Sequence, residues 1–442
     1  MRAALAAALA TGFLLVAAGC GSSTAAPGSS GHDAAALVPP TALAFVSVDT
    51  NLDSSQWKAV DDLTGALASL QKGLSEHKLD LDRDVRPALG DELGLAVLGV
   101  ENGKPEVIAL TQPKDESRLS ALAARFDQGS EHYTVQQIGG WSVVADSAQS
   151  FQAARDASSG RSLADLADFK TAMSQLSGNA LATAYAAGAG AAQLPSKLAA
   201  LVRVAGSPRW AAAKLAADKN GVQLDVRAAA APSPPYKPTL LRDVPSGAIA
   251  AVSFKDVNQL LARLASEPAL ATSLKSVESA TGLRVADLRA LTGEGVFSVS
   301  PGTLIPVVTL ELQPRNPDAA GKTLRAVAAK AARTLPLRVE RRGAKVLLTN
   351  AAAGFRLGGP SLVDDQQFKD ALAAAQVPDE VTWLAYADVQ RLLPIVQALA
   401  ALRGGGQNKP STNPRLDKLG TVVAFGARSG STGRLVLRLG SR

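Results

Sequence analysis

The chain has little of the residue types that build many catalytic and metal sites. Its 442 residues include one cysteine, three histidines and only 4% aromatic residues. A single cysteine excludes an internal disulfide and a site built from several thiolates. His32, His77 and His132 stand singly, whereas a metal site needs two or more ligands at workable spacing. Scarce aromatic rings also disfavour sugar clefts and single-strand nucleic-acid platforms, which rely on stacking. We therefore expect no metal and no cofactor. Export from the cytoplasm, which the N-terminal sequence predicts, excludes a nucleic-acid partner.

The one cysteine, Cys20, directly follows a short apolar start. Arg2 gives a positive beginning, and Ala3–Ala18 is almost wholly apolar. This run of about 16 residues is shorter than the ~20 that a membrane span needs. A positive start, a short apolar run and small residues before the cut are typical of a secretory signal. We predict a lipoprotein signal peptide at 1–19, with the lipid on Cys20. The alternative is a plain secreted protein that is cut after Ala26 and carries no lipid.

A segment rich in Gly, Ser and Ala follows the cysteine and ends at Val38. Such a composition favours a flexible chain, which would span on the order of 25 Å over its length. We predict a lipidated cysteine and flexible tether at 20–38. The protein would then be extracytoplasmic and anchored to the cell membrane by its lipid.

The rest of the chain repeats one order of landmarks at an offset of about 200 residues. Three pairs of landmarks illustrate the order: PPTALAFVSVD at 39–49 with VPSGAIAAVSF at 244–254, GGWSVVADS at 139–147 with RGAKVLLTN at 342–350, and Phe169-Lys170 with Phe368-Lys369. Unrelated segments would not keep both the order and the offset. We predict a first repeat at 39–230, a stiff Pro-rich linker at 231–243 and a second repeat at 244–442.

Each repeat has the same pattern of expected strands and helices. An alternating apolar strand opens it at Leu43–Val48 or Ile249–Phe254. One long helix or two broken helices follow at Ser55–Leu74 or Val257–Ala280. Two strands, a helix, a hairpin, a helix with the Phe-Lys pair, another strand, a helix and a closing hairpin complete it. Strands paired by hairpins with interspersed helices predict an α+β fold of two tandem homologous domains, each a largely antiparallel sheet with helices packed on it.

These landmarks resemble an actinobacterial envelope lipoprotein family catalogued as domain of unknown function 3352. The resemblance rests on three motifs: the opening Pro-x-x-Ala-Leu-Ala-Phe-Val-Ser-Val-Asp, the turn Leu89-Gly90-Asp91-Glu92-Leu93 and the segment Gly140-Trp141-Ser142-Val143-Val144-Ala145-Asp146-Ser147. The second repeat departs from it, because Ala344-Lys345 stands where Trp141-Ser142 does. The resemblance implies an exported, membrane-associated protein and supplies no catalytic residues.

Motifs of known enzyme classes are absent or incomplete. The chain has no Gly-x-Ser-x-Gly elbow and no nucleotide-binding glycine loop. Ser-x-x-Lys occurs at Ser55–Lys58 and Ser69–Lys72, but the Lys-Thr-Gly partner is missing and the polar face of a helix explains both. We predict no catalytic residues and a protein that is not an enzyme.

Two other groups of residues have a structural explanation beside the functional one. Asp80, Asp82, Asp84 and Asp91 have the spacing of a calcium loop, but Val85 takes the place of the glycine that its turn requires. Capping of a following helix explains the same acids. The four dispersed tryptophans suit core or sheet-face packing better than a ligand cage.

Charge is distributed unevenly between the two repeats. Residues 39–235 hold 18 basic and 22 acidic residues, whereas residues 236–442 hold 27 basic and 16 acidic ones. The second repeat would therefore suit an anionic lipid or wall polymer, unless the charges are scattered solvated surface. The predicted anionic-partner patch is Arg338, Arg341, Arg342 and Lys345.

The function that we expect is that of a non-enzymatic binding or accessory scaffold protein of the cell envelope. Its partner would be an anionic lipid, a wall polymer or another envelope protein. One alternative is a carrier of a lipid-like apolar ligand, which a cavity would support. The other is an unrecognised hydrolase, which paired buried carboxylates in one cleft would support.

Overall fold

The structure is a computed structural model. It describes residues 33–76, 78–101, 104–127, 132–176, 178–194, 196–230, 233–281, 291–302, 305–331, 336–352, 359–403 and 416–442. The signal peptide, Cys20, His32 and His77 lie outside the described residues. Contacts divide the chain into two compact units. Unit 1 comprises residues 1–193, 208–230 and 437–441, and unit 2 comprises residues 194–207, 231–436 and 442.

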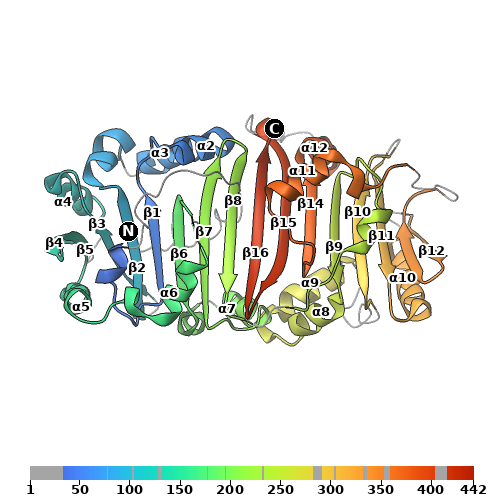
Figure 1. Cartoon of the computed structure of the whole chain (residues 1–442), viewed down its shortest axis with the longest axis horizontal. Helices are drawn as coiled ribbons and strands as arrows, with labels where there is room; N and C mark the ends of the chain where they lie inside the picture. Colours follow the sequence, from blue (N-terminus) through green and yellow to red (C-terminus); the bar gives the residue numbers. More distant parts are fainter. Residues whose placement is uncertain are drawn as a thin grey trace. The chain divides into compact units, whose positions relative to one another are not determined.

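Unit 1 is built on eight antiparallel strands (Figure 1). The strands are β1 (Ala44–Asp49), β2 (Glu92–Glu101), β3 (Lys104–Thr111), β4 (Thr134–Ile138), β5 (Trp141–Ala145), β6 (Ala182–Ala187), β7 (Trp210–Asp218) and β8 (Gly221–Ala228). Their order across the sheet is β8-β7-β6-β1-β2-β3-β5-β4. The sequence of β1 explains its place, because Phe45 and Ser47 are buried while their neighbours are partly exposed.

Three of the five helices of unit 1 begin at a polar side chain that caps their backbone N–H groups. They are α2 (Ser55–Thr64), α3 (Ala66–Glu76), α4 (Glu116–Ala124), α5 (Ala148–Ser159) and α6 (Ala167–Ser174). Ser54 caps α2, Asp115 caps α4 and Ser147 caps α5, each through its side-chain oxygen. Gly65, at a φ of 71°, ends α2 in the left-handed conformation that glycine adopts at low cost. Of the two alternatives for Ser55–Leu74, two broken helices are therefore correct, as α2 and α3.

Unit 2 is also built on antiparallel strands, drawn from yellow-green to red in Figure 1. The strands are β9 (Ala250–Lys255), β10 (Glu294–Ser300), β11 (Val307–Gln313), β12 (Arg338–Arg342), β13 (Lys345–Thr349), β14 (Trp383–Asp388), β15 (Leu419–Ser429) and β16 (Thr432–Ser441), of which β16 belongs to this unit up to Val436. Its helices are α7 (Ser196–Val204), α8 (Val257–Ala265), α9 (Ala271–Thr281), α10 (Pro317–Ala331), α11 (Gln366–Ala374) and α12 (Val389–Arg403).

The strand order of unit 2 reproduces that of unit 1. It runs β16-β15-β14-β9-β10-β11-β13-β12, so each strand has a counterpart eight numbers earlier. The aromatic packing is also the same: Phe169 meets Tyr185 edge to face at 5.2 Å, and Phe368 meets Tyr386 at 5.0 Å. Both units are therefore antiparallel sheets with packed helices, and the predicted α+β class is confirmed.

The predicted flexible tether ends earlier than expected. Asp33–Leu37 form a 3-10 helix, and Ala34, Ala35 and Val38 are fully buried in the core of unit 1. Burial of these small apolar side chains removes apolar surface from water, which favours the packed conformation over a solvated one. The prediction of flexibility is wrong for residues 33–38.

The predicted stiff linker at 231–243 is also wrong over most of its length. Tyr236, Leu240 and Leu241 are buried in the core of unit 2, and Thr239–Asp243 form a 3-10 helix. Tyr236 pairs with Val381 in an isolated bridge. Apolar side chains among the prolines therefore make this segment part of the second core.

The boundaries of the two units differ from those of the predicted repeats. Residues 194–207, from the first repeat, belong to unit 2, where Arg203 forms a bidentate ion pair with Glu267. Residues 437–441, from the second repeat, belong to unit 1. Helix α5 was not predicted; Phe151 and Ala154 of this helix pack in the core of unit 1.

Among the described residues, no helix has both the length and the apolar character needed to cross a membrane.

Candidate functional site

A polar pocket of about 450 Å³ opens in unit 2. Its described lining residues come from the segment before β9, from β11, from the β12–β13 hairpin and from the segment before α11. They are Arg242, Asp243, Val244, Pro245, Glu311, Arg342, Lys345, Gly359, Pro360 and Ser361. Half of them are charged, and the volume lies in the range of about 300–1,000 Å³ that small-molecule sites have.

An ion cluster centred on Lys345 forms part of this lining. The Lys345 ammonium donates to Asp243 Oδ2 at 2.6 Å and lies 3.3 Å from Glu311 Oε1. The side chain of Glu311 is only 9% exposed, whereas those of Lys345 and Asp243 are 29% and 40% exposed. The cluster therefore reaches from the protein interior to the pocket opening.

The environment shifts the protonation equilibria of this cluster. Burial raises the pKa of the Glu311 carboxyl, and the nearby Asp243 charge raises it further, while Lys345 acts in the opposite direction. Burial alone would lower the pKa of Lys345, but its hydrogen bond to Asp243 and the charge of Glu311 outweigh that effect and raise it. Lys345 thus stays charged, and Glu311 holds its proton to a higher pH than an ordinary glutamate.

The other three cations of the predicted patch are also ion-paired. Arg338 and Arg342 each contact Glu340, at 2.7 and 2.9 Å, and Arg341 contacts Asp318 of α10. All four cations lie on one hairpin, as predicted, but sequence reasoning missed their carboxylate partners. An ion-paired hairpin is a weaker attractant for polyanions than the sequence indicated.

Strand alternation separates Arg342 from Arg341. Arg341 opposes Val346 in the β12–β13 ladder, and Val346 packs under α10 in an apolar cluster. Arg342 opposes Lys345 and shares the pocket lining with it. Successive side chains of a strand point to opposite faces, so the hairpin has one face toward α10 and one toward the pocket.

The same positions in unit 1 hold apolar core residues. Hairpin register matches Ile138 and Trp141 with Arg342 and Lys345, because each pair closes its hairpin. Leu110 of β3 matches Glu311 of β11. Leu110 pairs with Val143 and Glu311 pairs with Leu347, and these two partners occupy the same position in their strands, two residues after Trp141 and Lys345.

A fourth position matches through a backbone hydrogen bond. Leu163 donates to Val38 O in unit 1, and Leu362 donates to Val244 O in unit 2. Leu37 and Asp243 directly precede these two valines and therefore correspond. The four residues that unit 1 has at these positions, all in one core cluster, are Leu37, Leu110, Ile138 and Trp141.

The register corrects one detail of the sequence comparison. We expected Ala344-Lys345 to stand in place of Trp141-Ser142. Lys345 instead matches Trp141 itself, because Gly139 and Gly343 are the corresponding turn glycines, at φ values of 59° and 61°. The alignment of the two repeats from sequence was shifted by one residue. It therefore did not show that the charged Lys345 takes the position of the buried Trp141.

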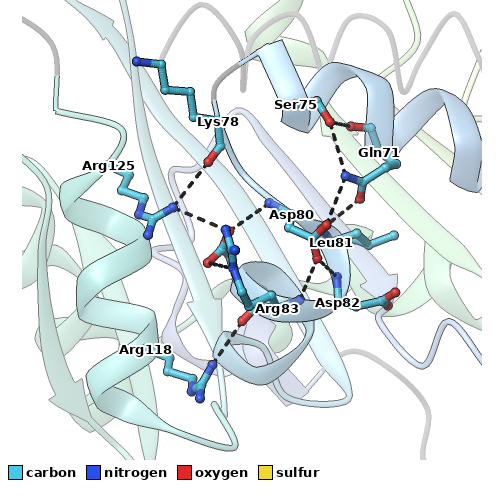
Figure 2. Close-up of polar contacts among 10 residues, drawn as sticks. Gln71, Ser75, Lys78, Asp80, Leu81, Asp82, Arg83, Arg118 and Arg125 are labelled. Carbon is cyan, nitrogen blue, oxygen red and sulfur yellow. Dashed lines mark hydrogen bonds and ion pairs between the residues drawn. The ribbon is translucent and has the colours of Figure 1, made fainter.

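Asp80, the first of the four acids that have the spacing of a calcium loop, caps the helical turn Leu81–Val85 (Figure 2). Asp80 accepts from the backbone N–H groups of Asp82 and Arg83, and Asp84 accepts from that of Asp80. The hydrogen bond from Arg83 lowers the pKa of Asp84, which also lies 3.5 Å from Arg125. Capping is therefore confirmed for Asp80, whereas Asp82 pairs with Arg86 and Asp91 with Lys114. The described residues include no group of three or more potential metal ligands.

The remaining sequence candidates are dispersed. Ser55, Lys58, Ser69 and Lys72 are exposed on α2 and α3. His132 is also exposed, 3.2 Å from Asp127. Trp141 and Trp210 are buried, at 7% and 1% exposure, as core packing predicts. None of these residues lines the polar pocket.

Comparison with known proteins identifies the family of the chain. A family model described as protein of unknown function (DUF3352) matches residues 1–301, more than half of the chain. The chain belongs to this family, as the sequence motifs predicted. No curated protein and no solved structure matches it. The match ends just after β10, so Glu311, Arg342 and Lys345 of the pocket lie beyond the matched residues.

Proposed function

We propose that this chain is an extracytoplasmic lipoprotein, anchored through Cys20, that serves as a non-enzymatic binding protein of the cell envelope. Unit 2 holds the ligand and unit 1 supports it. The N-terminal sequence supports the anchor, since a short apolar run meets the only cysteine of the chain. We further propose that the two units arose by duplication, because they share strand order and aromatic packing.

The observation that supports binding is the polar pocket of unit 2. Buried charge costs free energy and does not improve a core, because well-packed apolar residues are often as stable as an ion pair or more stable. Unit 1 has the apolar arrangement with the same strand order. A charged set at the matching positions of unit 2 therefore indicates a role other than folding.

The two alternative functions fit the pocket less well. A carrier of apolar ligands needs an apolar cavity, and half of this lining is charged. A hydrolase would use paired carboxylates, and the pocket does bring Glu311 and Asp243 together. Both carboxylates are bound to Lys345, however, and Asp243 is substantially exposed. The pair is therefore held as an ion cluster and not as two free carboxyl groups.

Fractionation of cells tests the anchor. Cys20→Ala should move the chain from the membrane fraction to the soluble or secreted fraction, or leave it as an uncleaved precursor. A mature chain that stays in the membrane fraction would contradict lipidation.

Binding to isolated envelopes tests the role of unit 2. In the Cys20→Ala background, Arg342→Glu with Lys345→Glu should reduce envelope binding severalfold. The matched control reverses two exposed, ion-paired cations of unit 1, Lys114 and Arg125. Charge reversal in unit 2 that left all envelope binding intact would overturn the proposal.

A further inference from the structure

The pocket of unit 2 has more hydrogen-bond donors than acceptors. An ammonium has three N–H donors and a guanidinium has five. Lys345 is bound to two carboxylates, which leaves one N–H direction. Arg342 is bound to Glu340 through Nη2, and its side chain is 47% exposed.

Arg242 adds a third cation to the lining. It is exposed, and no hydrogen bond or ion pair joins it to another residue of the described part of the chain. Its five donors face water or a ligand. The two carboxylates of the lining are already bound to Lys345. The pocket therefore presents free hydrogen-bond donors and few free acceptors.

The three cations approach the pocket from three separate elements. Arg242 comes from the 3-10 helix before β9, Arg342 from the end of β12 and Lys345 from the start of β13. A planar carboxylate best matches one guanidinium fork in its own plane. A phosphate presents oxygens in several directions and can accept from several separate cations.

We infer that the pocket of unit 2 binds a phosphate group, which accepts hydrogen bonds from Arg242, Arg342 and Lys345. Asp243 and Glu311 hold the Lys345 ammonium in place. This inference rests on the proposed binding function and names the chemistry of its ligand. The phosphate can belong to a phospholipid headgroup or be free in solution. Unit 1 binds no phosphate at the matching place, because Leu37, Ile138 and Trp141 fill it.

Calorimetric titration of the full chain carrying Cys20→Ala, at low ionic strength, tests the inference. The probes are inorganic phosphate, dihexanoyl phosphatidylglycerol below its micelle concentration, and acetate as the carboxylate control. We expect saturable binding of a phosphate probe. Binding of inorganic phosphate would indicate free phosphate as the source, and binding of phosphatidylglycerol alone would indicate a headgroup.

Two matched pairs of substitutions separate the pocket from general charge. Arg242→Gln with Arg342→Gln should weaken phosphate binding at least tenfold. Arg338→Gln with Arg341→Gln removes the same charge from the same region without touching the pocket lining and should leave binding within about twofold. Circular dichroism and thermal unfolding of each variant show whether it is folded. Equal losses in both pairs, or equal affinity for acetate, would overturn the inference.

Failure of this inference differs from failure of the proposed function. If neither phosphate probe binds but envelopes still retain the chain through Arg342 and Lys345, the binding function stands and the phosphate chemistry is wrong. If envelopes do not retain the chain and no probe binds, both are wrong.

Discussion

The two units have corresponding strands in the same order, but they differ in the side chains at one set of matching positions. Unit 1 buries both Trp141 and Leu110 in one apolar core, and α5 packs on the strands that hold them. Unit 2 has Lys345 and Glu311 at these positions and a pocket beside them. The chain between the hairpin and the following 3-10 helix is also shorter in unit 2, at residues 350–361 against 146–162 in unit 1. One backbone arrangement thus supports either an apolar core or a polar pocket.

The largest expected effect comes from placing one charge of unit 2 in unit 1. Leu110 is fully buried, and no lysine stands at the position of Trp141 to pair with a carboxylate. Leu110→Glu should lower the free energy of unfolding by at least about 3 kcal/mol, because it buries an unpaired charge. Urea unfolding measures this loss, with Leu110→Met, expected to cost less than about 1.5 kcal/mol, as the control. A small loss for the glutamate would mean that this core admits water.

A smaller loss should follow from breaking the ion cluster of unit 2. Lys345→Met leaves Asp243 and Glu311 close together without their cation. We expect a loss of about 2 kcal/mol at pH 7, below the usual cost for fully buried pairs because the pocket is partly solvated. The loss should shrink on acidification, since protonation removes the unpaired charge. A loss independent of pH would indicate lost packing and not lost pairing.

A smaller difference between the units is that Glu311 makes the stability of unit 2 depend on pH, whereas its counterpart Leu110 does not titrate. Burial raises the pKa of Glu311 from the ordinary value of 4.5, so the folded chain binds this proton more tightly than the unfolded chain. Glu311 therefore contributes stability below pH 4.5, and this contribution is lost as the pH rises through the raised pKa. Compared with Glu311→Gln, the wild-type chain should lose stability as the pH rises in that window. Denaturant unfolding from pH 4 to 7 gives the slope, and the opposite slope would mean that Lys345 dominates.

The smallest expected effect concerns a cap in unit 1. Asp80→Ala removes the oxygen that accepts from the backbone of Asp82 and Arg83 and should cost about 1 kcal/mol. Because capping explains these acids, millimolar calcium should change the unfolding of neither chain. Thermal unfolding with calcium and with a chelator checks this, and a shift in the wild type alone would restore the calcium interpretation.

Local patterns in the sequence predicted most of the fold. Alternating apolar residues located β1 and β9, and the Phe-Lys pairs located α6 and α11. The predictions for the segments at 33–38 and 231–243 were wrong. Gly, Ser and Pro in and around these segments indicate a flexible or extended chain, and this composition does not show that the alanines and leucines beside them are buried in a core. Their burial depends on partners far along the chain, such as Val381 for Tyr236.

The candidate site could be predicted only in part. The four cations of the β12–β13 hairpin lie close together in sequence, so they could be found. Asp243 lies 102 residues from Lys345, and its role depends on strand pairing that composition does not reveal. A signal was present nonetheless: Glu311 and Lys345 stand in strands at positions that are apolar in the first repeat. Correct hairpin register would have shown it.

The most direct test transfers the core of unit 1 into unit 2. The triple variant Asp243→Leu, Glu311→Leu and Lys345→Trp replaces the ion cluster with the matching residues of the first unit. Phosphate titration and urea unfolding of this variant are measured on the same preparation. Our account predicts a folded chain whose stability is unchanged or raised by up to about 4 kcal/mol, with phosphate binding lost. A folded variant that binds phosphate as the wild type does would contradict it.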